Sequence, residues 1–153
     1  MKEAKLTIIT KQPEINENLT FTTRTECVET NEGLKLNYEE NLSEEDVVNT
    51  QLVIGEDTVM VQRQGDIGGN MFFKETTTYE THYNAMGGLS LDMKIFTTNL
   101  DISKHENGIS AKIDYQLFLA GSSVGKMGMD IKHNHIFGGL SKNTVGITLV
   151  VKF

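Results

Sequence analysis

Tryptophan is absent from this chain, and cysteine and proline occur once each, as Cys27 and Pro13. A single cysteine cannot form an internal disulfide, which favours a reducing compartment over that of a disulfide-rich secreted domain. The near absence of proline favours β-strands, because proline removes a hydrogen-bond donor from the sheet. Without tryptophan, any internal pocket would be lined by Phe, Tyr, Met and aliphatic side chains.

Clusters of basic residues and long apolar runs are also missing. The formal net charge is −7, and a chain without a Lys/Arg patch is not expected to bind nucleic acid. No stretch approaches the length of a membrane-spanning helix, and the N-terminal residues lack the apolar run of a signal peptide. We therefore expect a cytoplasmic protein with no membrane partner, whose 153 residues form about one domain.

The strongest positive signal is the alternation of apolar and polar residues between Ile109 and Ile131. One face carries Ile109, Ala111, Ile113, Tyr115, Leu117 and Leu119 and, after a turn, Met127, Met129 and Ile131. A period of two with one apolar face predicts an antiparallel hairpin that covers a core and faces water. The same pattern predicts further strands at 5–11, 19–30, 34–41, 48–54, 58–64, 70–83 (one bent strand or two), 89–98, 99–104 and 145–153. Helix is expected only within 42–50.

Sequential strands joined by short turns indicate an all-β fold, an antiparallel up-and-down closed β-barrel. Closure removes exposed strand edges, which this chain has few prolines to protect. A two-sheet β-sandwich is the alternative. We assign residues 1–132 to one barrel domain and residues 133–153 to a C-terminal extension. Its terminal strand would pack on the barrel or pair with a second copy of the chain, giving a homo-oligomer.

Several short segments, taken in order, resemble a known family. They are VMVQRQG at 59–65, MFF at 71–73, YETHY at 79–83, the strand at 89–98, Gly108-Ile109 and Tyr115-Gln116-Leu117. Their order and spacing over roughly residues 5–132 are similar to those of the YwiB-like family of small bacterial proteins. The resemblance implies a calycin-like, lipocalin-type barrel and a cytoplasmic bacterial protein. It implies no reaction, because the family is one of unknown function.

Two charged residues continue apolar registers and are therefore candidate interior groups. Arg63 follows Val59 and Val61 at a spacing of two, and Glu40 follows Leu36 and Tyr38 in the same way. Because a lone buried charge is costly, each would need the other as partner. Such a pair would be a structural ion pair at the barrel end, or Arg63 would anchor the acidic head group of a ligand.

A flexible apolar lining is predicted beside this pair. The tentative ligand-binding residues of the barrel interior are Arg63, Glu40, Tyr38, Tyr115, Met93, Met127 and Met129. Methionine adapts to irregular ligands, although a barrel of this size is also readily filled by its own side chains. The sequence therefore predicts non-enzymatic binding of a small, mainly apolar ligand, the alternative being a protein-interaction or assembly module with a filled barrel.

No catalytic motif and no cofactor are expected. The sequence lacks a nucleophile elbow, a phosphate-binding loop and a dinucleotide fingerprint. His133 and His135 would lie on one face of an extended strand and could together bind a metal ion, but a third ligand is not evident. We therefore expect no metal site, and interpret His133-Asn134-His135 as a solvated loop.

Overall fold

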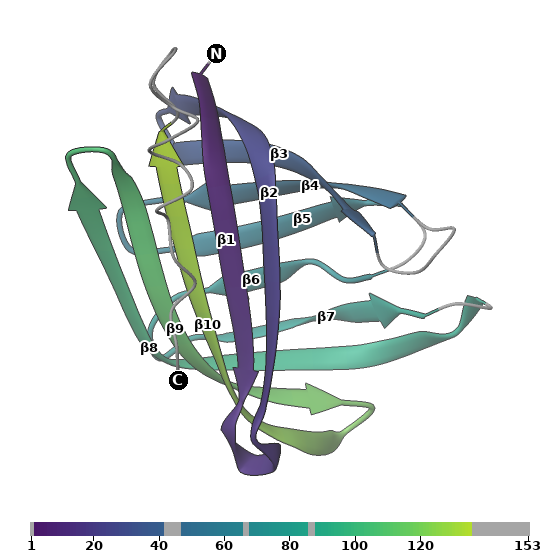
Figure 1. Cartoon of the computed structure of the whole chain (residues 1–153). Helices are drawn as coiled ribbons and strands as arrows, with labels where there is room; N and C mark the ends of the chain where they lie inside the picture. The colour runs from purple at the N-terminus through teal and green to yellow at the C-terminus, as the bar shows by residue number, and fades with distance from the viewer. Residues whose placement is uncertain (1, 42–46, 66–67, 86–87, 136–153) are drawn as a thin grey trace.

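Ten antiparallel strands form one sheet that curls into a nearly closed barrel (Figure 1). The structure is a computed structural model and describes residues 2–41, 47–65, 68–85 and 88–135. The strands are β1 Lys2–Gln12, β2 Glu17–Thr30, β3 Gly33–Asn41, β4 Val47–Ile54, β5 Val59–Gln64, β6 Met71–Phe73, β7 Thr78–Asn84, β8 Ser90–His105, β9 Gly108–Leu119 and β10 Ser122–His135. A short 3₁₀ helix, η1 (Pro13–Ile15), joins β1 to β2. The expected all-β barrel is confirmed.

The first strand of the chain pairs with the last described one, β10, in the middle of the sheet. The order in the sheet is β6-β5-β4-β3-β2-β1-β10-β9-β8-β7, so β6 and β7 are its two edges. These edges lie side by side, and two hydrogen bonds of 2.8 and 3.0 Å between Gly68 and Asn84 join the chain across the seam. All the strands therefore belong to one sheet, in contrast to the two sheets of the sandwich alternative.

Two expectations about strand boundaries are wrong. The strands expected at 89–98 and 99–104 are a single strand, β8, whose register shifts between Thr97 and Asn99. This irregularity interrupts the alternation in the sequence without ending the strand. The helix considered within 42–50 is not formed over its described part, because Val47–Ile54 is strand β4.

The far C-terminus lies largely outside the described residues. Strand β10 continues to His135, beyond the expected domain boundary at 132, and pairs with β1 from Ala4↔His135 to Lys11↔Gly128. Residues 136–153, and with them the strand expected at 145–153, are outside the described part of the chain. Within the described residues, no helix has the length and apolar character needed to cross a membrane.

Apolar side chains fill the middle of the barrel. Those with at most 2% of their surface exposed include Leu6, Leu36, Leu52, Ile54, Val59, Phe73, Ile95, Ile113 and Ile131. A side chain without accessible surface borders no void large enough for water, so the barrel is packed here. The packed middle leaves two ends. The first end carries the β2–β3, β4–β5 and β8–β9 turns, and the second end carries Arg63 of β5 and the β9–β10 turn.

Candidate functional site

Arg63 and Glu40 form a half-buried ion pair at the second end of the barrel. The Nε atom of Arg63 donates to Oε1 of Glu40 over 2.9 Å, and Nη2 lies 3.4 Å from Oε2. The two side chains are 19% and 16% exposed. The two-point contact fixes the plane of the guanidinium group, as is usual for arginine–carboxylate pairs. The structure thus brings together the two charges that the sequence placed on interior registers.

Neighbouring polar groups hold the pair in place. The Thr50 hydroxyl donates to Oε1 of Glu40 over 2.6 Å, and Nη1 of Arg63 donates to the Gly69 carbonyl over 2.8 Å. The backbone N–H of Arg63 donates to Oδ1 of Asn70. These contacts tie β3, β4 and β5 to the segment that leads into β6. Because three of the five guanidinium N–H groups serve protein acceptors, this arginine has a clear structural role.

Two buried tyrosines lie within the electrostatic reach of Arg63. Burial raises the pKa of Tyr38 well above its usual value, the Glu40 carboxylate raises it further, and Arg63 opposes both. Burial raises the pKa of Tyr115 to about 12, again opposed by Arg63. Tyr38 also packs on Phe21, with ring centroids 5.6 Å apart, and Tyr115 packs on Phe73 at 5.0 Å. Both phenols are therefore neutral at physiological pH.

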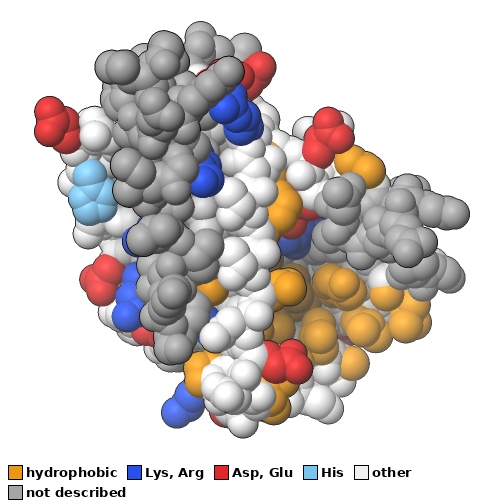
Figure 2. Space-filling model, in the orientation of Figure 1, with side chains coloured by type: hydrophobic (Ala, Val, Ile, Leu, Met, Phe, Trp, Pro, Cys, Tyr) orange, Lys and Arg blue, Asp and Glu red, His pale blue; other side chains and the backbone are white. Residues whose placement is uncertain are grey.

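Beyond the tyrosines, apolar side chains pack against the core without being fully buried. They are Ile8, Phe21, Met71, Tyr79, Tyr83, Leu117, Leu119 and Met127, together with Leu100 and Ile102. Most of these side chains lie toward the second end of the barrel. The exceptions are Tyr79, Leu100 and Ile102, which lie nearer the first end or the middle. Figure 2 shows hydrophobic side chains gathered in a hollow on this side of the molecule. The second end is thus apolar and half-exposed, with the Arg63–Glu40 pair beside it.

The comparisons with known proteins place the chain in a family. A family model described as "Domain of unknown function (DUF1934)" matches residues 5–131. The chain belongs to this family. The fold of this chain is similar to that in the crystal structure of the ywiB protein from Bacillus subtilis, with a TM-score of 0.73 and 20% sequence identity. The match covers 88% of this chain and 92% of the ywiB protein. None of the curated proteins matches this sequence.

These findings confirm the resemblance to the YwiB-like family and the calycin-like barrel. The likeness to the solved structure concerns the fold, and the DUF1934 description assigns no activity. The function of this chain must therefore be argued from its own side chains.

The structure brings most of the expected interior residues together. Tyr38 and Tyr115 join Arg63 and Glu40 at the second end, as described above. Met127 lies opposite Tyr115 in the β9–β10 pair and is half-buried. Met93 and Met129 are 5% and 7% exposed and belong to the packed core. The methionine lining expected for a pocket is therefore mostly core, with Met127 at its edge.

The expectation that His133 and His135 lie in a solvated loop is wrong. Both residues are in β10, on the face that points into the barrel, and His133 is only 2% exposed. Their rings meet edge to face, with centroids 4.6 Å apart. Burial, and secondarily His135, lowers the pKa of His133 to about 4, so its imidazole is neutral at physiological pH. The sequence could not show that β10 continues this far, because the Gly-rich segment that follows obscures its end.

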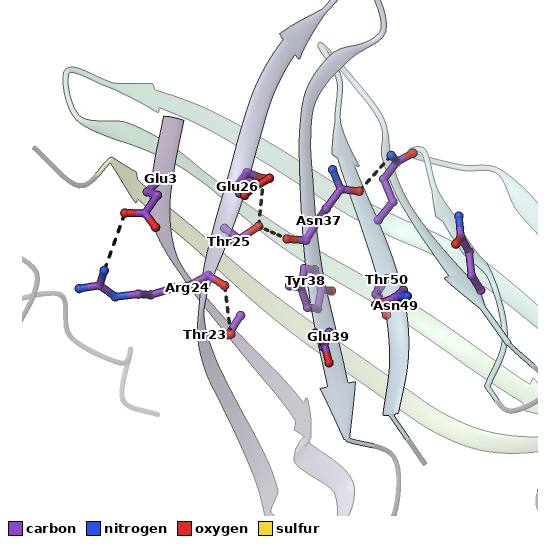
Figure 3. Close-up of a pocket in the computed structure, with 12 residues that line it drawn as sticks. Glu3, Thr23, Arg24, Thr25, Glu26, Asn37, Tyr38, Glu39, Asn49 and Thr50 are labelled. Atoms are coloured by element: carbon purple, nitrogen blue, oxygen red, sulfur yellow. Dashed lines mark hydrogen bonds and ion pairs between the residues drawn. The ribbon is translucent and has the colours of Figure 1, made fainter. Parts of the chain in front are cut away.

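A polar groove runs over the outer surface where β2 separates from β3 (Figure 3). The two strands pair only from Glu26↔Asn37 to Thr30↔Gly33, and the Thr25 hydroxyl extends the contact by donating to the Asn37 carbonyl over 2.7 Å. The groove has a volume of about 520 Å³. Its lining combines exposed Glu, Asn and Gln side chains with the buried Thr25, Tyr38 and Thr50, and offers no concentrated charge or nucleophile. We assign it no chemical role.

Two residues that the structure places at candidate sites were not assigned to a site from the sequence. Thr50 anchors Glu40, and its position two residues before Leu52 in an inward register was the available signal. Cys27 is 3% exposed and lies at the first end near His133 and His135. Cys27 lies near the two histidines because β1 pairs with both β2 and β10. No local sequence pattern predicts this pairing.

Proposed function

We propose that this protein is a non-enzymatic binding protein that takes a small, mainly apolar ligand at the second end of the barrel. The observation that carries the proposal is the set of inward-facing apolar side chains left half-exposed there, including Phe21, Leu117 and Met127. Exposed apolar surface of this kind is costly in water and is commonly retained where a ligand covers it. The packed middle of the barrel limits how deeply such a ligand could enter.

The Arg63–Glu40 pair would receive the polar head of the ligand. The hydrogen bonds described above leave two guanidinium N–H groups without an acceptor among the described residues. Glu40 already neutralises Arg63, so a second carboxylate would be repelled by the first. A hydroxyl or amide head group fits the pair better than an acid, and it takes the place of the acidic head group expected from the sequence.

The test compares decanol and decanoic acid as probes of the full-length protein. At a concentration of one hundred times Kd, binding raises the free energy of unfolding by about 2.7 kcal/mol. For a chain of this size, the melting temperature should then rise by about 5–10 °C. Displacement of a fluorescent hydrophobic dye would measure Kd for each probe. If neither probe shifts the melting temperature or displaces the dye, the proposal fails.

Neighbouring residues on β9 provide a matched pair of variants. Leu117 points into the barrel and Gln116 points outward. L117E places a carboxylate on the apolar surface and should abolish binding of decanol, whereas Q116E should leave it unchanged. L119E, nearer the rim, serves the same purpose if L117E does not fold. Equal binding by wild type and both inward variants would contradict the site.

A free sheet edge favours protein interaction as a second candidate function. Glu17–Thr25 of β2 pair with β1, and their other edge has no strand partner among the described residues. Leu19 on this segment is 74% exposed, and Ile15 in the preceding turn is 56% exposed. Such an edge can accept a strand from another chain. If it does so, L19E should reduce the oligomeric mass measured by sedimentation; an unchanged mass would count against it.

A further inference from the structure

The first end of the barrel carries a cluster of one thiol and two imidazoles. Cys27 of β2 meets His133 and His135 of β10, and one candidate ligand atom from each lies within 4.8 Å of the others. Residues two apart on a strand point to the same side, which explains why both histidines face inward. Strand β1 lies between β2 and β10, and there His135 is paired with Ala4, whose single methyl group leaves room for the imidazole.

His133 carries a signature of a missing partner. Both of its ring nitrogens are buried and have no hydrogen-bond partner among the described residues. A buried polar atom left unsatisfied costs about 1–3 kcal/mol, so such atoms usually have a ligand, a water molecule or a functional role. Here the neutral ring lies against the ring of His135 and close to a buried cysteine. These are the surroundings in which an imidazole nitrogen serves as a metal ligand.

We propose that Cys27, His133 and His135 form a zinc-binding site. Thiolate sulfur and imidazole nitrogen are the preferred protein ligands of Zn²⁺. In a tetrahedral zinc site the ligand atoms are about 3.5 Å apart. Small rotations of the three side chains therefore bring atoms that are now within 4.8 Å into coordination. The cluster supplies the third ligand that the two histidines lacked in the sequence.

An acidic pocket gives this site access to solvent. The pocket has a volume of about 480 Å³, and both histidines line it. Four glutamates, Glu29, Glu32, Glu56 and Glu106, also line it, against the basic Lys104 and His105. A concave surface with an excess of carboxylates raises the local concentration of cations. The fourth coordination position of the zinc ion would be taken by a water molecule from this pocket, as in zinc sites with three protein ligands.

The test uses Co²⁺ as a spectroscopic substitute for Zn²⁺ in the chelator-treated, full-length protein. We expect one equivalent of Co²⁺ to give a thiolate-to-cobalt charge-transfer band and the intense visible bands of tetrahedral cobalt. Addition of Zn²⁺ should remove both. C27S should abolish the charge-transfer band, and C27S, H133N and H135N should each weaken Zn²⁺ binding by at least about a hundredfold.

Two controls separate the site from general effects. His82 is an exposed histidine on β7 paired with Asp92, so H82N should bind cobalt as the wild type does. Circular dichroism of each metal-free variant tests whether it folds, and H135N, whose ring is only partly buried, is the variant least expected to disturb packing. Cobalt bound without a charge-transfer band, or with equal affinity by C27S, would overturn the proposal and assign binding to the pocket carboxylates. Absence of binding would overturn it too.

Discussion

Removing either member of the Arg63–Glu40 pair should destabilise the protein at least as much as removing both. In R63M the Glu40 carboxylate keeps only the Thr50 hydroxyl among the bonds described, and in E40M the guanidinium keeps only the Gly69 carbonyl. Breaking a buried ion pair costs 3–5 kcal/mol. Because these side chains retain 16–19% of their exposure, water recovers part of the loss. We expect about 3 kcal/mol for each single variant, at the lower end of that range.

The double variant E40M/R63M removes both charges and leaves only neutral groups without partners. The Thr50 hydroxyl and the Gly69 carbonyl each lose a hydrogen bond, at about 1.5 kcal/mol apiece, giving about 3 kcal/mol in all. Two single costs of about 3 kcal/mol against a double cost of about 3 kcal/mol give a coupling energy of about 3 kcal/mol.

Urea unfolding followed by circular dichroism measures these energies, since the chain has no tryptophan to report by fluorescence. With a slope of about 2 kcal/mol per molar urea, each single variant should unfold at about 1.5 M less urea than the wild type. Q62M, at an exposed neighbour of Arg63, should change the free energy by less than about 0.5 kcal/mol. Additivity of the single effects to within about 0.5 kcal/mol would refute the reasoning.

Two further predictions concern pH and backbone conformation. Because the pKa of Tyr115 is raised from 10.0 to about 12 in the folded protein, the unfolded chain loses this proton first. The free energy of unfolding should therefore fall between pH 10 and 12, by about 1.4 kcal/mol per pH unit for this residue. Urea titrations at several pH values should show a smaller fall for Y115F. Equal slopes of the free energy against pH in Y115F and the wild type would contradict this. Gly33 has φ of +129°, and a Cβ atom there would lie 2.2 Å from the Ile54 carbonyl oxygen, whereas Gly121, with φ of +81°, has open space. G33A should thus lower the melting temperature much more than G121A. If both variants lower it equally, the positive φ angle and not the overlap with Ile54 determines the loss of stability.

Alternation in the sequence predicted which way side chains point, but not which end of the barrel they reach. Arg63 and Glu40 follow apolar registers on strands that are neighbours of β4, so their meeting needed only local hairpins. The Cys27 cluster instead needs β1 to pair with two strands from opposite ends of the chain. Its formation depends on how the strands are staggered around the whole barrel. The alternation of apolar and polar residues in the sequence gives no information about this stagger.

The packed middle decides how the two proposed sites relate. Ile95, Ile113 and Ile131 have no accessible surface, so no channel wide enough for water passes beside them from one end to the other. A ligand at Arg63 would therefore reach its site only from the second end of the barrel, and a metal ion at His133 would reach its site only from the first end. The barrel is therefore filled at its centre, and its polar candidate sites lie at its two ends. Because the two proposed sites share no residue and are separated by this core, failure of either experiment above would leave the other proposal standing.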